Sequence, residues 1–282
     1  MNELAIGVCG WCIDRHDVRR SIEVAGELVL SAIQIGFFSR AAVRTFVQGS
    51  TSPRKDTGSE LPVAPTRIVG AFVAFEREDY SSIARIAETG GLMPDDLYAE
   101  RAATIEEVID VASGLGCPLV ALHAGTVPSD RTSAAFVKLV ERVRKTCDAC
   151  AGRGLRLLLE TGRESADSLL ALIYAVDRSN LGVNFDTGNF TVYGTDDPVA
   201  AVTKLKGRID LVHVKDAFAS VSPGQEYGKP APLGQGDVNV ARVLSKLRAT
   251  GYRGPLLLEV DARTAGVGVL RDAAAYLRTM LV

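Results

Sequence analysis

Five ionisable side chains each lie near the end of a separate apolar run, and their types suit metal chemistry. They are His123 in "PLVALHAG", Glu160 in "RLLLETG", Asp186 in "LGVNFDTG", His213 in "LVHVKDA" and Glu259 in "GPLLLEVDA". Burying unpaired charge costs several kcal/mol, so converging carboxylates would need a cation. Oxygen ligands with one imidazole favour Mn²⁺, Mg²⁺ or Co²⁺ over Zn²⁺. The pattern therefore predicts one divalent metal ion at Glu160, Asp186, His213 and Glu259, with Mn²⁺ as the first choice and Zn²⁺ as the least favoured.

The apolar runs that carry these residues are expected strands, and they alternate with amphipathic helical patterns. Strand candidates cover residues 4–11, 32–38, 67–75, 118–125, 156–162, 181–188, 211–217 and 254–262. The clearest helical patterns cover residues 98–114, 132–150, 165–177, 238–249 and 268–281. The strands are continuously apolar, which is typical of a parallel sheet covered on both faces. Eight β–α units in 282 residues predict one domain, residues 1–282, folded as a single (β/α)8 TIM barrel.

The C-terminal ends of the strands form the active-site face of such a barrel. Period-two alternation places Leu211, His213 and Lys215 on one face of their strand, which directs His213 into the barrel mouth. A doubly wound open sheet is the structural alternative. However, "GVCGWCIDRHD" after the first strand lacks the glycine-rich dinucleotide fingerprint.

One segment interrupts the alternation of strands and helices. Residues 47–67 are polar and rich in Gly, Ser and Pro, where a full second helix would be expected. The base rates of loops favour a plain surface loop, and a lid over the barrel mouth is the alternative.

Composition excludes several classes of partner. The net charge is -2, from 32 basic and 34 acidic residues, which argues against a sequence-independent nucleic-acid binder. No apolar run approaches the ~18–20 residues of a membrane span, and the amino terminus lacks the pattern of a signal peptide. The expected protein is cytoplasmic.

The five cysteines are expected to be free thiols with a packing role. Cys147 and Cys150 continue an amphipathic stripe at helical spacing, and the pairs "CGWC" and "CDAC" lie too far apart for a zinc ribbon. Cys9 and Cys12 lie near the end of the first strand, where the packing interpretation is weaker.

An ordered set of motifs resembles a known superfamily. "LLLETG", "VNFDTGN", "VHVKDA", "PLGQGDVN" and "GPLLLEVD" look like the xylose isomerase-like TIM-barrel superfamily, in the branch labelled sugar phosphate isomerase/epimerase. The likeness spans most of the chain from the third strand onward. That superfamily includes ketose 3-epimerases, hydroxypyruvate isomerase, inosose dehydratase and endonuclease IV.

The resemblance implies a single metal held by Glu160, Asp186, His213 and Glu259, with both glutamates moving protons. A metal would stabilise an enediolate while one glutamate removes the proton next to a carbonyl and the second returns one. We expect a metal-dependent sugar isomerase or epimerase acting on a small carbohydrate, and relatives are often homodimers or homotetramers. A keto-sugar dehydratase or lyase on the same site is the alternative.

Two other classes of function are less favoured. An endonuclease IV-like phosphodiesterase is disfavoured because the chain has only three His, and a sugar-sensing protein without catalysis is a further class.

Four further residues are candidate substrate contacts. His123 lies at a strand end, and Trp11 could offer an apolar wall to a sugar face or pack in the core. Many relatives carry a His three positions after the strand-six Asp, whereas this chain has Asn189, which can hydrogen-bond a hydroxyl but cannot exchange a proton. Lys215 either pairs with Asp216 or polarises a substrate oxygen.

The glycines of "PLGQGDVN" have two interpretations. Gly234 and Gly236 could bind a phosphate with their N–H groups, because phosphate often binds in the loops after strands seven and eight. The favoured alternative is a tight turn in which Asp237 caps the following helix.

Overall fold

Eight parallel strands close into a barrel, as the sequence predicts. The computed structural model describes residues 4–50, 66–260 and 262–281. Around the barrel the strands follow the order β1-β10-β7-β6-β5-β4-β3-β2. Their bounds are β1 (Ile6–Cys9), β2 (Ala32–Phe37), β3 (Arg67–Val73), β4 (Leu119–Leu122), β5 (Arg156–Glu160), β6 (Leu181–Asp186), β7 (Ile209–Val214) and β10 (Leu256–Leu258).

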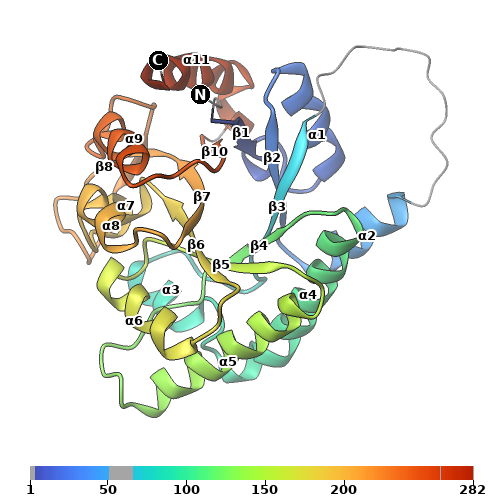
Figure 1. Ribbon diagram of the computed structural model, residues 1–282, viewed down its shortest axis with the longest axis vertical. Helices are drawn as coiled ribbons and strands as arrows, with labels where there is room; N and C mark the ends of the chain where they lie inside the picture. The colour runs from blue at the N-terminus through green and yellow to red at the C-terminus, as the bar shows by residue number, and fades with distance from the viewer. Residues whose placement is uncertain (1–3, 51–65, 261, 282) are drawn as a thin grey trace.

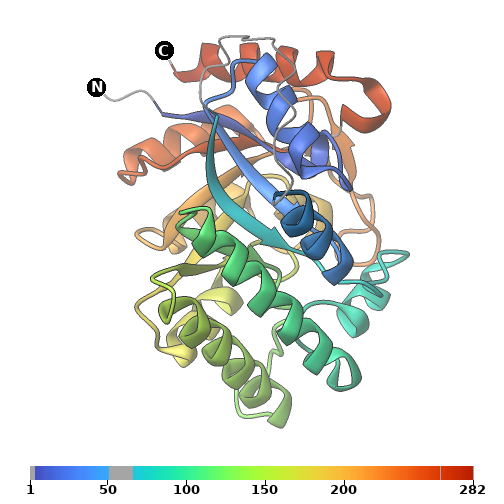
Figure 2. The same cartoon turned by 90° about the vertical axis from the view of Figure 1, so that its right-hand side faces the viewer.

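Helices surround the strands (Figure 1). They are η1 (Gly10–Cys12), α1 (Val18–Glu27), α2 (Arg40–Ser50), α3 (Ile83–Thr89), α4 (Asp95–Gly114), α5 (Ala134–Ala151), α6 (Ala166–Val176), α7 (Asn189–Tyr193), α8 (Pro198–Lys204), α9 (Val240–Ala249), α10 (Ala262–Ala265) and α11 (Gly268–Leu281). In the view turned by 90°, α11 (red) and α5 (yellow-green) lie at opposite ends of the molecule (Figure 2). None of the helices in the described residues combines the length and the apolar character needed to cross a bilayer.

The alternation of side chains along each strand builds two separate apolar layers. Leu256 and Leu258 of β10 belong to the large core between strands and helices, whereas Leu257 belongs to a smaller cluster inside the barrel. In β7, Val212 and Val214 likewise face the helices. Continuous apolar runs are therefore required, because both faces of each strand are buried.

Side chains at the first turns satisfy the free N–H groups of several helices. Ser133 accepts a hydrogen bond from the N–H of Phe136 at the start of α5, and Ser165 does the same for Ser168 at the start of α6. These caps explain why the helices begin within two residues of the predicted starts at 132 and 165.

The structure corrects two details of the predicted organisation. Residues 47–50 form the last turn of α2, and Arg67 begins β3, so the polar segment is shorter than predicted. Residues 51–65 of that segment, where a lid was the alternative prediction, lie outside the described residues. A small antiparallel pair, β8 (Asp216–Phe218) and β9 (Lys229–Ala231), was not predicted from the sequence.

Candidate metal centre and cavity

The Nδ1 atom of His213 is the point on which three carboxylates converge. Oε1 of Glu160 lies 2.8 Å from it, Oε2 of Glu259 lies 3.0 Å away and Oδ2 of Asp186 lies 3.9 Å away. One ligand atom from each of the four residues lies within 4.8 Å of the others. The four residues come from or directly follow β5, β6, β7 and β10, which are consecutive in the barrel. The structure thus brings together all four residues that the sequence predicts as metal ligands.

The opposite nitrogen of His213 is held by a residue that sequence reasoning missed. Oε1 of Gln34, on β2, lies 2.6 Å from Nε2 of His213, and Asn184 of β6 lies against the same ring. The strand register shifts between Ile33 and Gln34 and between Val183 and Asn184. Such irregularities re-aim side chains. A polar residue within each apolar run, "AIQIGFF" and "LGVNFDTG", was the signal that could have identified both.

Each glutamate uses its second oxygen for a different partner. Oε2 of Glu160 lies 2.8 Å from Nε2 of His123, and Oε1 of Glu259 accepts a hydrogen bond from Nζ of Lys215 at 3.1 Å. Lys215 also donates to Oδ1 of Asn189 at 3.0 Å. Both oxygens of each glutamate therefore lie near a nitrogen group, one near His213 and one near a second residue.

Two threonines that follow the acidic strand ends tie neighbouring strands together. The hydroxyl of Thr161 accepts from the N–H of Asp186 and donates to its carbonyl oxygen, and Thr187 makes the same pair of bonds with Lys215. The next residue in each case is glycine. At Gly162, φ is +129° and a Cβ atom would lie 2.1 Å from the Cβ of Asn189. The sequences "ETG" and "DTG" thus bring the strand ends close enough to form one site.

Burial and neighbouring charges shift the pKa values of the carboxyl groups at the site in different directions. Burial raises the pKa of the Asp186 carboxyl well above its usual range; Lys215 opposes this shift, and the nearby Glu259 and Glu160 add to it. Burial also disfavours a charged Glu160, but the imidazoles of His123 and His213 hold the pKa of that carboxyl at about 2. The three neighbouring acids thus oppose one another's charge, and the shift this causes falls on Asp186.

The donor set fits a divalent ion. Within the described residues, neither Oδ2 of Asp186 nor Oε2 of Glu259 has a hydrogen bond of suitable geometry, although both are buried. Both atoms belong to the set that converges on His213. Buried polar atoms without partners are rare, and a cation at this point would satisfy both of them. Three carboxylates and one imidazole suit a hard or borderline ion.

A cavity of about 340 Å³ lies above the acidic residues and is large enough for a small molecule. Its polar lining includes the predicted substrate contacts His123, Asn189 and Lys215 together with Glu160 and Glu259. The aromatic part of its lining consists of Trp11, Phe38, Phe72, Tyr80, Tyr193 and Tyr227. The sequence singled out only Trp11, because the other rings come from β3, α7 and loops whose convergence depends on the fold.

The xylose isomerase-like TIM barrel family model matches residues 82–280. This chain belongs to that family. A crystal structure of a xylose isomerase domain protein from Planctomyces limnophilus has 32% sequence identity and a TM-score of 0.85, over 99% of this chain and 97% of that chain.

Curated relatives of this xylose isomerase-like barrel include two dehydratases. The 3-dehydroshikimate dehydratase of Pseudomonas aeruginosa is 30% identical over 163 residues, which cover 55% of this chain and 25% of that protein. The inosose dehydratase of Clostridium beijerinckii is 25% identical over 138 residues, which cover 44% of this chain and 46% of that protein. The matched regions thus span about half of one relative and a quarter of the other.

More distant solved structures share the fold of the xylose isomerase-like barrel. A D-tagatose 3-epimerase-like protein aligns with a TM-score of 0.70 at 20% identity, over 99% of this chain and 97% of that chain. A xylose isomerase-like TIM barrel protein from Mycobacterium smegmatis in complex with magnesium aligns with a TM-score of 0.65 at 19% identity, over 93% of this chain and 87% of that chain.

The glycine turn of this xylose isomerase-like barrel already holds a carboxylate. The N–H groups of Gly234 and Gly236 both donate to Oδ2 of Asp216, at 2.8 and 3.0 Å. A phosphate at these two N–H groups would have to displace Asp216, so the turn interpretation is favoured. The predicted cap was wrong: Asn239 caps α9, and Asp237 accepts from the N–H of Ala219.

Two other predictions from the sequence are resolved by these contacts. Lys215 pairs with Glu259 across the site, while Asp216 accepts backbone N–H groups of the glycine turn.

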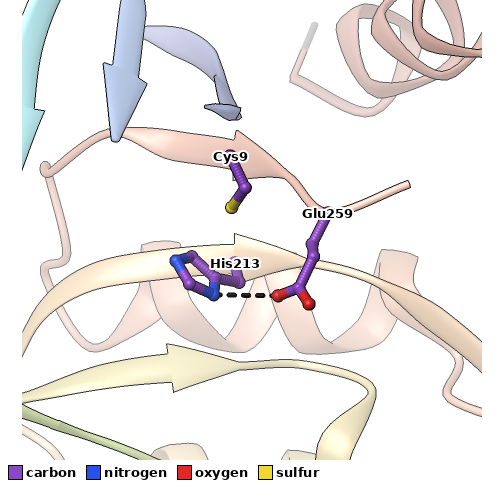
Figure 3. A group of neighbouring side chains, drawn as sticks. All are labelled: Cys9, His213 and Glu259. Atoms are coloured by element: carbon purple, nitrogen blue, oxygen red, sulfur yellow. Dashed lines mark ion pairs between the residues drawn. The ribbon is translucent and has the colours of Figure 1, made fainter. Parts of the chain in front are cut away.

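Cys147 and Cys150 are fully buried on α5, as the helical stripe predicts. For Cys9 the packing interpretation is incomplete, because its Sγ lies within 4.8 Å of ligand atoms of His213 and Glu259 (Figure 3).

Proposed function

We propose that this protein is a divalent-metal-dependent isomerase or epimerase that moves a proton next to the carbonyl of a small carbohydrate. The observation that carries the proposal is the arrangement of Glu160 and Glu259. Both carboxylates line the cavity, and each has one oxygen directed to Nδ1 of His213 and one to a second nitrogen group.

Glu160, Asp186, Glu259 and Nδ1 of His213 would hold the ion. When bound, a divalent ion supplies a Lewis acid that polarises a carbonyl oxygen. Gln34 orients the ligand, because an Nε2–H bond to its amide oxygen leaves the lone pair of Nδ1 directed to the carboxylates. Manganese is our first choice for the native ion.

The two glutamates would act as the acid and base. One removes the proton from the carbon next to the carbonyl, and the other delivers a proton to the same carbon or to its neighbour. Delivery to the opposite face of the same carbon inverts it, whereas delivery to the neighbouring carbon moves the carbonyl. His123 and Lys215 orient the two carboxylates through the contacts at their second oxygens.

The lining of the cavity supports a carbohydrate as the substrate. Trp11, buried apart from 8% of its surface, packs edge-on against His213 and offers an apolar face beside the polar residues. Asn189 and Lys215 can hydrogen-bond hydroxyl groups, in keeping with their proposed role as substrate contacts. Because Asp216 accepts the N–H groups of Gly234 and Gly236, these groups are not free to bind a phosphate of the substrate.

Elimination of water is a second candidate reaction. Both named curated relatives described above are dehydratases. The same proton abstraction leads to elimination when the neighbouring carbon carries a leaving hydroxyl, so the residues would keep their roles.

Solvent exchange in D₂O tests the proposal and separates the two reactions. Ketoses and 3-dehydroshikimate would be incubated with the manganese-loaded protein and analysed by mass spectrometry and proton NMR. Isomerisation or epimerisation yields product at the substrate's mass plus deuterium, whereas dehydration loses one water. Glu160→Gln and Glu259→Gln should each reduce turnover by at least about 100-fold. Full turnover of either variant with full metal occupancy would refute its proposed role.

Metal content provides an independent test. Plasma mass spectrometry of the purified protein should find about one divalent ion per chain, and a His213→Ala/Asp186→Ala double variant should lose it. If the unaltered protein neither contains nor binds Mn²⁺, Mg²⁺, Co²⁺ or Zn²⁺, the metal-dependent mechanism is wrong.

A further inference from the structure

The thiol of Cys9 lies against the metal centre but takes no part in the four-residue set. Cys9 ends β1, which pairs with β10 so that Val8 lies beside Leu258. One residue further along each strand come Cys9 and Glu259. On the other side of β10, Leu257 pairs with His213 of β7. Cys9, Glu259 and His213 therefore come from three consecutive strands at nearly the same height.

The orientation of the three side chains brings their ligand atoms together. Cys9 is fully buried in the cluster inside the barrel. Its sulfur and the carboxylate of Glu259 both point toward the ring of His213 (Figure 3). Sγ, a ring nitrogen and a carboxylate oxygen all lie within 4.8 Å of one another. Oε2 of Glu259, which lies 3.0 Å from Nδ1 of His213, is also a buried carboxylate oxygen without a suitable hydrogen bond among the described residues.

The ligand chemistry of this second group differs from that of the first. Three carboxylates and an imidazole suit manganese or magnesium, whereas sulfur, nitrogen and one oxygen suit zinc. A site with three protein ligands of these types is typical of zinc bound with one open position.

We propose that Cys9, His213 and Glu259 form a second, thiophilic metal site that binds Zn²⁺ and excludes the ion held by Glu160, Asp186, His213 and Glu259. Exclusion follows because both sets need His213 and Glu259. On binding, the Sγ–H bond of Cys9 breaks, its proton passes to solvent, and a sulfur–zinc bond forms without a change of oxidation state. Zinc is then an inhibitor of the manganese form, a consequence that rests on the proposed function.

Cadmium serves as the spectroscopic substitute for zinc, because a cadmium–thiolate bond has an ultraviolet charge-transfer band. Titration of the metal-free protein with Cd²⁺ should produce this band. Cys9→Ser should abolish the band, whereas Cys150→Ser, on the far side of the barrel wall in α5, should keep it. Cys9→Ser should also weaken Zn²⁺ binding by at least about tenfold while changing Mn²⁺ affinity by less than about threefold.

A variant of the other set separates the two sites. Asp186→Asn should weaken Mn²⁺ binding by at least about tenfold and retain the cadmium–thiolate band. Zn²⁺ should displace Mn²⁺ from the unaltered protein but do so at least about tenfold less effectively in Cys9→Ser. Thermal unfolding followed by circular dichroism establishes whether each variant is folded. If Cys9→Ser does not fold, the same measurements are made with Cys9→Ala.

The outcomes distinguish this inference from the proposed function. Normal Mn²⁺ binding without a thiolate band, or a band that persists in Cys9→Ser, overturns the thiophilic site alone. Failure of both Mn²⁺ and Cd²⁺ to bind overturns both proposals. A thiolate band that depends on Cys9 supports the thiophilic site whatever the effect of Asp186→Asn. If Asp186→Asn leaves Mn²⁺ binding unchanged, that result contradicts the set of Glu160, Asp186, His213 and Glu259.

Discussion

Gln34 of β2 holds His213 of β7 across the inside of the barrel, past the two strands between them. Its amide oxygen lies 2.6 Å from Nε2 of His213, although β2 and β7 are not neighbours in the sheet. Both side chains are completely buried. Since a neutral imidazole carries one proton, an Nε2–H bond to Gln34 leaves Nδ1 free to act as a ligand.

Gln34→Leu should weaken Mn²⁺ binding by about 10- to 100-fold, because the imidazole loses the partner that orients it. Isothermal titration calorimetry measures the change. The matched control is Ile35→Val on the outer face of the same strand, which should cost about 0.5–1.5 kcal/mol of stability and leave Mn²⁺ affinity unchanged. Equal loss of Mn²⁺ affinity in both variants would show that Gln34 acts only through stability.

Gly162→Ala should destabilise the fold by about 3 kcal/mol or more, because backbone strain and a steric clash with Asn189 add together. The clash is between the new Cβ and the Cβ of Asn189, which would lie 2.1 Å apart at φ of +129°. Gly154→Ala is the control, since its φ is +72° but nothing lies within 4 Å of the new atom. Strain alone should cost about 1–2 kcal/mol there. Urea unfolding compares the two, and equal losses would exclude the clash.

Asp79→Asn should remove a stabilisation that depends on pH. Hydrogen bonds from Ser81, together with Arg85, lower the pKa of the Asp79 carboxyl from 3.8 to about 2. A lowered pKa in the folded state stabilises the protein above the unfolded value, and this contribution is lost as pH falls through the folded value. The difference in urea midpoint between wild type and Asp79→Asn should therefore be constant above about pH 5 and shrink between about pH 4 and 2. A difference that does not vary across this range would contradict the prediction.

Ser133→Ala should cost about 1 kcal/mol, because the N–H of Phe136 loses its acceptor at the start of α5. Ser133→Asp should retain most of the stability, since aspartate is an equally good cap. Thermal unfolding followed by circular dichroism measures both. If the two substitutions lower the melting temperature equally, the hydroxyl does not act as a cap.

The barrel and the four acidic and imidazole residues of the site could be predicted from local patterns. Each strand is a short apolar run because both of its faces are buried, and this holds whatever the strand's neighbours are. Parallel strands that close into a barrel have their C-terminal ends at one face. The positions of Glu160, Asp186 and His213 at three strand ends were therefore sufficient to predict their proximity.

Contacts across the barrel and between loops depended on the tertiary structure. Asp216 bonds with Gly234 and Gly236 only because the turn folds back onto β8, so the sequence favoured the wrong capping residue in that loop. Cys9 resembles an ordinary buried strand residue in the sequence, and Gln34 differs from one only in being polar within an apolar run. Strand spacing alone predicts which residues reach the barrel mouth, but the closed sheet and its shifts in register decide which of them touch.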